Sequence, residues 1–320
     1  MFKLSARIEI RSATKRWTFD RIARVEITRD MDTLTDLCVM TLPRKVRWQG
    51  EERMPVQRGD EVGVWLGYDD DLSLAFRGFV TTIGVKTPVE IHCEDQMFRL
   101  KQQEARRLAY KSATVEEVLR DQNLGVPFRV FGEQRIGQFR VTASTVTELL
   151  GQLKDQGGIR SFFRLEEGEP VLYSGVLFER EASVRQVFAT GVNLIDDTQL
   201  EVQNAEDLKI KVRAISLLPN NKCVRIDVGD ADGEKRTLHA YNKNEQELRA
   251  WAEQELRRLK QDGLRGTFTT FGAVLIDKLD HIGIRIDGIR RGVYQVQKNI
   301  IKYGTDGFRQ EITIGKRVMQ

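Results

Sequence analysis

Hydrophobic and polar residues alternate along most of the first hundred positions, which is the pattern of half-buried β-strands. Residues 21–29 and 35–42 alternate cleanly, and a further short run covers 89–93. Several strands separated by turn signals predict an antiparallel barrel or sandwich. Residues 94–104 have the pattern of a helix, and we expect this helix to close a first β-barrel domain that spans 1–104.

One strand-pair pattern occurs twice in the chain. The two copies are residues 60–66 with 77–80, joined by a turn at 67–71, and residues 280–286 with 291–294, joined by a turn at Asp287 and Gly288. Asp, Gly, Arg and Gly recur at matching positions, and β-branched residues fill the same alternating slots. This match predicts two similar antiparallel β-barrel modules in one chain, so the fold class is mainly β with some helix.

Between the two copies, residues 105–185 mix short helices with strands. Thr114 and Thr145 are each followed three residues later by glutamate, which is the spacing of a capping box, so we expect a helix to start at each threonine. The glycines at 157–158 predict the end of the second helix, and 161–173 has the pattern of a hairpin. A small α/β domain is the simplest interpretation of this segment.

From residue 186 the strand pattern returns and predicts the second β-barrel, over 186–320, with a helix packed on it near 245–262. The helix can be capped by Asn244 and end before Gly263. Its apolar stripe consists of Leu248, Trp251, Ala252, Leu256 and Leu259. The remaining strands are predicted at 208–218, 223–228, 267–270, 294–303 and 308–314.

Charge and hydropathy narrow the class of protein. The chain of 320 residues has 51 basic and 47 acidic residues, and a net charge of +4 is weak for a dedicated nucleic-acid binder. A composition with 31% charged residues and only six prolines argues against disorder and fibrous repeats. Neither a secretory signal nor an apolar run of membrane-spanning length is evident, so we expect a soluble protein without stable membrane insertion.

The cysteines and acidic clusters suggest no metal site. Cys38, Cys93 and Cys223 are widely separated, and we predict that all three are small buried apolar residues in a reducing compartment. The acidic tract at 69–71 lies in the first repeat turn, where solvated carboxylates are routine. Residues 229–233 resemble a calcium loop, but the ligand positions fall on Val228 and His239, so a hairpin turn is expected instead.

No catalytic residue, cofactor site or metal ligand is predicted, and we expect the protein not to be an enzyme. The three histidines, His92, His239 and His281, carry no catalytic constellation, and the G-x-S-x-G, H-E-x-x-H and P-loop motifs do not occur. The carboxylate pairs at 166–167 and 196–197 are merely adjacent in sequence. The tripeptide at 58–60 spells an adhesion motif but should form the turn that begins the repeat.

Two basic clusters leave an alternative open. They are Lys101, Arg106, Arg107 and Lys111 near the end of the first barrel, and Arg257, Arg258 and Lys260 at the end of the long helix. Such charges commonly offset a helix dipole. The other interpretation is a charged annulus that faces an acidic partner or passing nucleic acid, without sequence-specific recognition.

Several segments resemble baseplate hub proteins of contractile phage tails and the hub domains that begin the VgrG spikes of type VI secretion. The matching segments are 56–62, 66–68, 76–80 and 91–95 in the first barrel, and 252–256, 262–268, 292–296 and 307–310 near the C-terminus. They are mostly glycine and turn patterns, and the segment 105–185 matches least.

The resemblance implies a structural baseplate hub of a contractile phage tail or related injection system. Hub proteins form a homotrimer in which two barrels per chain make a pseudo-sixfold ring that joins the tail tube to the central spike. The implied partners are a separate spike protein, tail tube and baseplate wedge proteins, and the tape-measure protein and DNA that pass through the channel. The implied location is the virion tail baseplate, after assembly in the bacterial cytoplasm.

Two other functions stay open at this point. A tail-associated carbohydrate-binding or adhesion module would need an exposed aromatic platform, for which Trp17, Trp48, Trp65 and Trp251 are the candidates. Core packing explains Trp65 and Trp251 more simply. A cell-wall hydrolase would need a cleft with paired carboxylates or a Cys/His pair.

Overall fold

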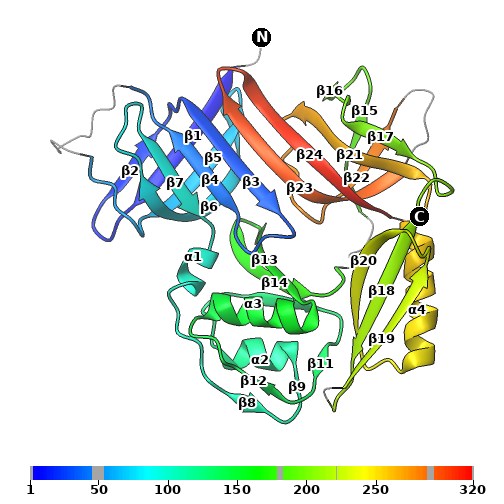
Figure 1. Cartoon of the computed structure of the whole chain (residues 1–320). Helices are drawn as coiled ribbons and strands as arrows, with labels where there is room; N and C mark the ends of the chain where they lie inside the picture. The colour runs from blue at the N-terminus through cyan, green and yellow to red at the C-terminus, as the bar shows by residue number, and fades with distance from the viewer. Residues whose placement is uncertain (1–2, 45–53, 179–182, 221, 287–291, 319–320) are drawn as a thin grey trace.

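Most strands of the residues that the structure describes join in one fourteen-stranded sheet (Figure 1). The computed structural model describes residues 3–44, 54–178, 183–220, 222–286 and 292–318. The N-terminal strands are β1 (Leu4–Arg11), β2 (Arg16–Phe19), β3 (Arg24–Asp30), β4 (Leu37–Thr41), β5 (Glu61–Tyr68), β6 (Asp71–Ile83) and β7 (Glu90–Glu94). The C-terminal strands are β15 (Val184–Ala189), β16 (Leu194–Asp196), β17 (Leu200–Gln203), β21 (Gly263–Phe271), β22 (His281–Arg285), β23 (Gly292–Gly304) and β24 (Gly307–Val318).

The two halves of this sheet meet where β3 pairs with β23 in an antiparallel ladder that sets Ile27 opposite Ile301. The main strand order is β16-β21-β24-β23-β3-β4-β7-β6-β5-β1-β2. The core of the N-terminal half also contains Ile301, Tyr303 and Phe308 from the C-terminal half. The mainly β fold is therefore confirmed, but the described residues form no closed barrel, because β3 pairs with β23 and not with β2.

The helix expected over 94–104 is much shorter than predicted. Only α1 (Met97–Leu100) forms, with the Asp95 carboxylate accepting a hydrogen bond from the Met97 N–H. The chain then leaves the helix, and Glu104 forms a β-bridge with Thr145 of the next unit. Because the backbone of Glu104 is paired in this bridge, it cannot form the last turn of the predicted helix.

The middle unit has the two helices predicted from their threonine caps. Both capping boxes are present, at the starts of α2 (Val115–Asp121) and α3 (Val146–Gly157), and Gly158 ends α3 with a φ of +68°. The predicted hairpin is also confirmed as β13 (Arg160–Glu166) and β14 (Glu169–Gly175). The other strands are β8 (Ala109–Tyr110), β9 (Ala113–Thr114), β10 (Phe128–Phe131), β11 (Arg135–Ile136) and β12 (Phe139–Arg140). These elements enclose a separate apolar core.

The long helix does not pack on the large sheet as expected. Instead, α4 (Glu245–Leu259) covers β18 (Ile210–Leu217) and β19 (Cys223–Gly229) of a separate three-stranded sheet, which also contains β20 (Glu234–Tyr241). Leu248 and Ala252 of α4 are fully buried there. Asn244 caps the helix as predicted. The helix lies on this sheet because residues 210–259 enclose their own apolar core.

The turn at 229–233 is not a hairpin between neighbouring strands. β18 lies between β19 and β20 and runs parallel to β20, so the turn crosses the start of β18. The Ile210 N–H donates to the Asp230 carboxylate, and the Asp230 N–H donates back to the Ile210 carbonyl. A β-carbon at Gly233 would lie 2.7 Å from the Ile210 backbone, so the crossing requires glycine.

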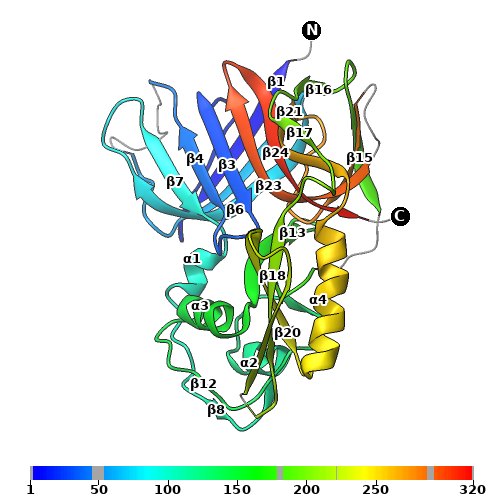
Figure 2. The same cartoon turned by 45° about the vertical axis from the view of Figure 1, so that its right-hand side comes forward.

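The large sheet, the middle unit and the small sheet with α4 are the three parts of the structure. In Figures 1 and 2 the large sheet lies above the middle unit and above the small sheet with α4. The hairpin of β13 and β14 lies directly beneath the large sheet, and α1 leads the chain from β7 into the middle unit. The junction beneath the sheet is where segments distant in sequence meet.

Candidate functional site

The two copies of the repeat begin with the same turn. The Asp60 carboxylate accepts the Gln57 N–H, and the Asp280 carboxylate accepts the Asp277 N–H, both at 2.8 Å. The carbonyl of each aspartate accepts a backbone N–H from the returning strand, from Val80 at 2.9 Å in the first copy and from its counterpart at 2.8 Å in the second. The duplication seen in the sequence is therefore a duplication of backbone geometry.

These hydrogen bonds correct the sequence alignment of the returning strands. By their hydrogen bonds to the turn, Val80 and Val296 are counterparts. If Gly78 were instead aligned with Gly292, the counterpart of Val80 would be Tyr294. The two matches differ by two residues, which keeps each side chain on the same face of its strand. The second turn predicted between the strands, at Asp287 and Gly288, lies outside the described residues.

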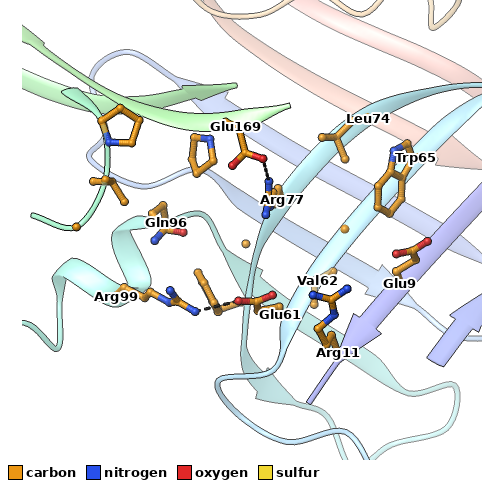
Figure 3. A pocket seen from close by; sticks show the side chains of 17 residues that line it. Glu9, Arg11, Glu61, Val62, Trp65, Leu74, Arg77, Gln96, Arg99 and Glu169 are labelled. Carbon is orange, nitrogen blue, oxygen red and sulfur yellow. Dashed lines mark hydrogen bonds and ion pairs between the residues drawn. The ribbon is translucent and has the colours of Figure 1, made fainter. Parts of the chain in front are cut away.

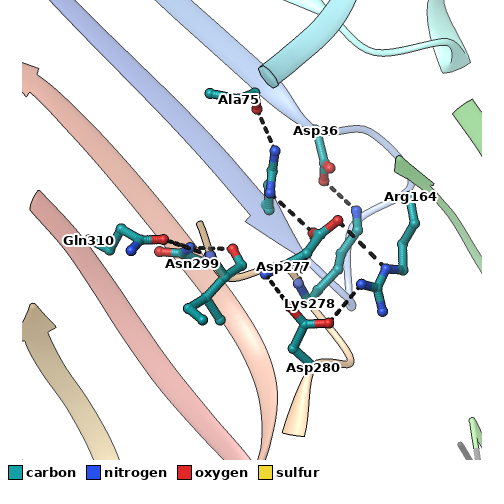
Figure 4. A network of polar contacts seen from close by, with 10 residues as sticks. Asp36, Ala75, Arg164, Asp277, Lys278, Asp280, Asn299 and Gln310 are labelled. Carbon is teal, nitrogen blue, oxygen red and sulfur yellow. Dashed lines mark hydrogen bonds and ion pairs between the residues drawn. The ribbon is translucent and has the colours of Figure 1, made fainter. Parts of the chain in front are cut away.

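The second copy of the turn contributes to a buried network of charges beneath the sheet (Figure 4). Lys278 is fully buried, and its ammonium lies 2.5 Å from the carboxylate of Asp36, which precedes β4. The same ammonium lies 4.9 Å from the centre of the Phe162 ring in β13. One side chain of the turn therefore contacts both the N-terminal half of the sheet and the middle unit.

The acidic residues of the turn bind two buried arginines. Asp277 lies 3.5 Å from Arg29 of β3 and 3.5 Å from Arg164 of β13. Arg164 also forms an ion pair of 2.8 Å with Asp280. Burial alone would raise the pKa of Asp277, but Arg29 and Arg164 together lower it. The carboxylate form is thus stabilised by cations from two different parts of the chain.

Neutral side chains of the last two strands hold the segment that carries this turn. Gln310 of β24 accepts the Ile276 N–H and donates to the carbonyls of Phe271 and Val274. Asn299 of β23 donates to the Ile276 carbonyl at 2.7 Å. Both side chains are fully buried. They anchor 271–276 to the sheet, so the charged turn that follows has a fixed position.

Of this charged network, the sequence patterns pointed only to Asp280, as the first residue of the second repeat copy, and they did not indicate its charged partners. Arg29 offered a signal, because it occupies the same alternating face as Val25 and Ile27, which are buried. A charged residue at an inward-facing position needs a partner of opposite charge. The identity of that partner was not readable, since Asp277 is almost two hundred and fifty residues away in the sequence.

A cleft of about 460 Å³ lies between the N-terminal half of the sheet and the middle unit (Figure 3). Ion pairs form its walls: Arg99 with Glu61 at 2.9 Å, and Arg77 with Glu169 at 2.7 Å. The second of these pairs joins β6 to β14 of the middle unit. A third glutamate of the cleft, Glu9, pairs with an arginine of β2. Each carboxylate is thus held by a cation, whereas a glycosidase acid must be kept protonated.

Trp65 lines this cleft and is not part of the core, contrary to our expectation. Its ring lies over Gly63, where a β-carbon would come within 2.5 Å of the ring. The Arg7 guanidinium stacks on the ring at 4.6 Å from its centre. An adhesion platform would present an open ring face, and Arg7 covers this one. Trp251 of α4 is partly buried and packs against the core of the small sheet as predicted, and Trp48 lies outside the described residues.

The histidines lie apart from one another and on different strands. His92 is half exposed on β7, with its imidazole 4.0 Å from Glu90. His239 on β20 packs close to Gly158, and burial lowers its pKa. His281 is buried at the start of β22, next to the charged turn. The structure brings no two of them together in the described residues.

The acidic tract of the first repeat is bound by protein groups. Asp69 accepts the Lys3 N–H, and Asp70 accepts the Ser5 hydroxyl, both at 2.8 Å. Both aspartates have positive φ angles, of 50° and 66°, as a tight hairpin turn requires. Among the described residues, no group of three or more His, Cys, Asp or Glu side chains is placed to hold a metal ion.

One cysteine differs from the prediction. Cys38 and Cys93 are buried and lie opposite each other on β4 and β7, whereas Cys223 is exposed at the start of β19. β19 is an edge strand of the small sheet, and Cys223 lies on the face that α4 does not cover. Alternation in this strand already places Cys223 on the same face as Arg225 and Asp227, opposite Val224, Ile226 and Val228, and the prediction of burial overlooked this.

The basic clusters are mostly engaged in local contacts. Lys101 pairs with Glu94 at 2.6 Å, and Lys260 pairs with Asp230 at 2.5 Å. Arg106 donates to the Asp121 carbonyl at the end of α2. The contact of Arg106 with a carbonyl at the end of α2 agrees with the interpretation that these charges offset a helix dipole, whereas Lys101 and Lys260 are bound by neighbouring carboxylates.

Exposed apolar side chains gather at the C-terminal end of the large sheet. They belong to β15, β16, β17, β21 and the turn between the first two of these strands, and are Val187, Val192, Ile195, Val202 and Phe271, with exposed fractions of 42% to 77%. Single exposed apolar residues are normal, but several on the outer strands of one half of a sheet indicate a contact surface. None of the helices in the described residues has the length and apolar character needed to cross a bilayer.

Comparison with solved structures identifies the fold. A tail protein from Neisseria meningitidis MC58 aligns over 97% of this chain and 96% of its own, at 15% identity and a TM-score of 0.66. The 43 kDa tail protein of prophage MuSo2 from Shewanella oneidensis aligns over the same shares at 14% identity and a TM-score of 0.61. The E. coli c3393 protein, a type VI secretion component similar to the phage T4 tail proteins gp27 and gp5, aligns over 97% of this chain and 76% of its own, at 11% identity and 0.56.

No family profile and no curated protein matches the sequence. At these identities the comparisons show a common fold. The resemblance read from the glycine and turn patterns is thereby confirmed as a fold shared with phage tail proteins over nearly the whole chain.

Proposed function

We propose, on the premise that this chain has the fold of phage tail proteins, that it is the baseplate hub of a contractile tail or related injection system. In this role three chains form a pseudo-sixfold ring that joins the tail tube to a separate central spike. The shared fold supports a structural role in a tail, and it extends over nearly the full length of two solved tail proteins.

The repeated turn is the observation that carries this proposal. A chain with two similar modules presents two similar faces, so three chains would present six to a sixfold tube. The turns at 57–60 and 277–280 share their hydrogen bonds, and each leads into an antiparallel strand pair of the same large sheet. In this proposal the modules are residues 1–104 and 186–320, with 105–185 as the domain between them.

The ends of the sheet are the proposed contacts between chains. Within the described residues, β2 pairs only with β1 at one end. At the other end of the described sheet β17 pairs only with β21 and β15 only with β22, and Leu194 of β16 also bridges Thr190. Open edges carry unpaired backbone groups that a neighbouring chain can satisfy. Because the two ends differ, their contact would be heterologous, and it would close as a ring if each chain is rotated by one third of a turn from the next.

The remaining partners follow from the same proposal. The ring would contact tube and wedge proteins, and tape-measure protein and DNA would pass through its channel without sequence-specific binding. The near balance of basic and acidic residues would keep the channel from retaining DNA. The role is non-enzymatic, at the baseplate of the virion tail, with assembly in the bacterial cytoplasm.

Light scattering of the purified protein over a wide concentration range tests the ring. The expected mass is three times the chain mass of 36.8 kDa. Val202→Asp should shift the mass to that of one chain, since it places a charge on an exposed apolar edge strand. Val85→Asp is the matched control, because Val85 is 97% exposed in the N-terminal half, away from this edge. A trimer that Val202→Asp leaves intact would contradict the proposed contact, and a monomer at every concentration would contradict self-assembly.

A further inference from the structure

The buried junction beneath the sheet holds more acidic than basic groups. Its cations are Arg29, Arg164 and Lys278, and its carboxyl groups are those of Asp36, Asp95, Asp277 and Asp280. All seven side chains are at least four-fifths buried, and Lys278 is fully so. With every group ionised the junction would carry one uncompensated negative charge. A buried charge without a partner is costly, and such a group usually takes up a proton.

The geometry identifies which carboxyl group lacks a cation. Asp36 contacts Lys278, and Asp277 and Asp280 contact Arg164. Asp95 is 5% exposed and forms no ion pair within the described residues. Its two oxygens accept hydrogen bonds from the backbone N–H groups of Asp36 at 3.0 Å and Met97 at 2.9 Å.

Asp95 lies where the chain passes from the sheet to the middle unit. It follows β7 directly and caps α1, which leads into the middle unit. Its N–H donates to the Asp36 carbonyl, so the two aspartates lie side by side. Asp36 in turn holds Lys278, which stacks on Phe162 of the middle unit. A change of charge at Asp95 therefore acts on the contact that joins β4, the turn at 277–280 and β13.

We propose that Asp95 is a proton-operated latch between the large sheet and the middle unit. With a proton on Asp95 the junction is neutral, and Lys278 holds the sheet and β13 together. Without the proton, the second negative charge beside Asp36 competes for Lys278 and loosens the contact. This inference concerns the chain itself and does not depend on its role in a tail.

The electrostatic surroundings support this assignment. Burial, followed by the charge of Asp36, raises the pKa of Asp95 to about 7, and Lys278 and the two N–H donors offset only part of this rise. Burial also raises the pKa of Asp36 and of the nearby thiols Cys38 and Cys93. Tyr173 lies beside Arg164, and His281 follows Asp280 on the far side of the turn.

The sign of the pH effect follows from proton binding. Between the ordinary carboxyl pKa and about 7, the folded protein holds a proton on Asp95 that the unfolded chain has lost. The stabilisation is therefore complete at low pH and is lost as the pH rises through 7. Asp95→Asn keeps the shape of the protonated group and cannot ionise; it retains one of the two acceptors, so its loss of the other N–H partner is the same at every pH.

Thermal unfolding from pH 5.5 to 8.5 is the first test. The wild-type midpoint should fall by on the order of 5 °C relative to that of Asp95→Asn. Asp227→Asn is the matched control: Arg213 holds the pKa of this exposed carboxyl at about 2, so the variant should keep the wild-type response. Equal pH responses in the wild type and Asp95→Asn would overturn the proposal.

A distance measurement separates a latch from a mere stability effect. Spin labels at Val85→Cys, in the loop between β6 and β7 of the large sheet, and at Lys111→Cys in the middle unit report the spacing between the two parts by pulsed electron resonance, in a Cys223→Ser background. The distance distribution should broaden at pH 8.5 and stay narrow when Asp95→Asn is added. If that variant does not fold, Asp36→Asn provides the second comparison: it removes one negative charge, so the junction is neutral with Asp95 ionised and the distribution should stay narrow at pH 8.5. An identical distribution at both pH values overturns the latch.

Discussion

The two copies of the repeated turn have the same backbone and different surroundings. In the first copy Arg58 is exposed, and its guanidinium lies 5.8 Å from the centre of the Phe98 ring in α1. In the second copy the equivalent cation, Lys278, is fully buried and lies 4.9 Å from the centre of the Phe162 ring. One turn starts a strand near the surface, whereas the other joins three parts of the chain. The two copies thus share the backbone conformation of the turn, but only the second has neighbouring residues that let it connect different parts of the chain.

Removing the buried cation should have the largest effect. Lys278→Met leaves the Asp36 carboxylate buried without its partner, and breaking such a pair typically costs about 3–5 kcal/mol. The equivalent change in the first copy, Arg58→Met, should cost less than about 1 kcal/mol because the side chain is exposed. Denaturant unfolding of both variants measures the difference. Equal losses would show that burial of the second turn does not matter energetically.

The turn aspartates should separate the two copies by a smaller amount. Asp60→Ala and Asp280→Ala each remove the acceptor of one backbone N–H, which costs about 1 kcal/mol. Asp280→Ala also takes a charged partner from buried Arg164, so its cost should exceed that of Asp60→Ala by about 1–3 kcal/mol. Free energies of unfolding from urea titrations give both values. A larger loss for Asp60→Ala would reverse the comparison.

The residue before each aspartate gives the smallest effect. Gly59 has a φ of +92°, and its counterpart Leu279 has a φ of +68°. Gly59→Ala should cost about 1 kcal/mol, because L-residues are strained in this region although no atom lies within 4 Å of the new β-carbon. Gly151→Ala in α3 is the control with equal free space, and it should stabilise the helix slightly. If both substitutions shift the unfolding temperature in the same direction, backbone strain at position 59 is not the cause of the effect.

Local signals in the sequence predicted local structure well. Thr114, Thr145 and Asn244 each marked a helix start, because a cap and its glutamate act within one turn of helix. The repeat was also readable, since the turn needs aspartate and the strands need alternation. Edge strands β15 to β17 were not predicted: β16 and β17 have only three and four residues, and the apolar residues of β15 do not alternate with polar ones.

Contacts between distant segments could not be predicted. The sequence indicated that α4 has one apolar face, but nothing local showed that β18 and β19 would cover it. The closure of two barrels was expected because each copy has enough strands, yet β3 pairs with β23 across the two halves. The charged junction was missed for the same reason, since Asp36 and Lys278 meet only in the folded chain.

Electron cryo-microscopy of the purified protein most directly tests the proposal that two similar modules per chain build a tail hub. Particles should be imaged at the concentration where the trimer is most populated in solution. The account predicts rings of three chains that show six similar lobes when viewed along the threefold axis. Isolated chains, or rings in which the lobes from 1–104 and 186–320 are unrelated in shape and position, would contradict it.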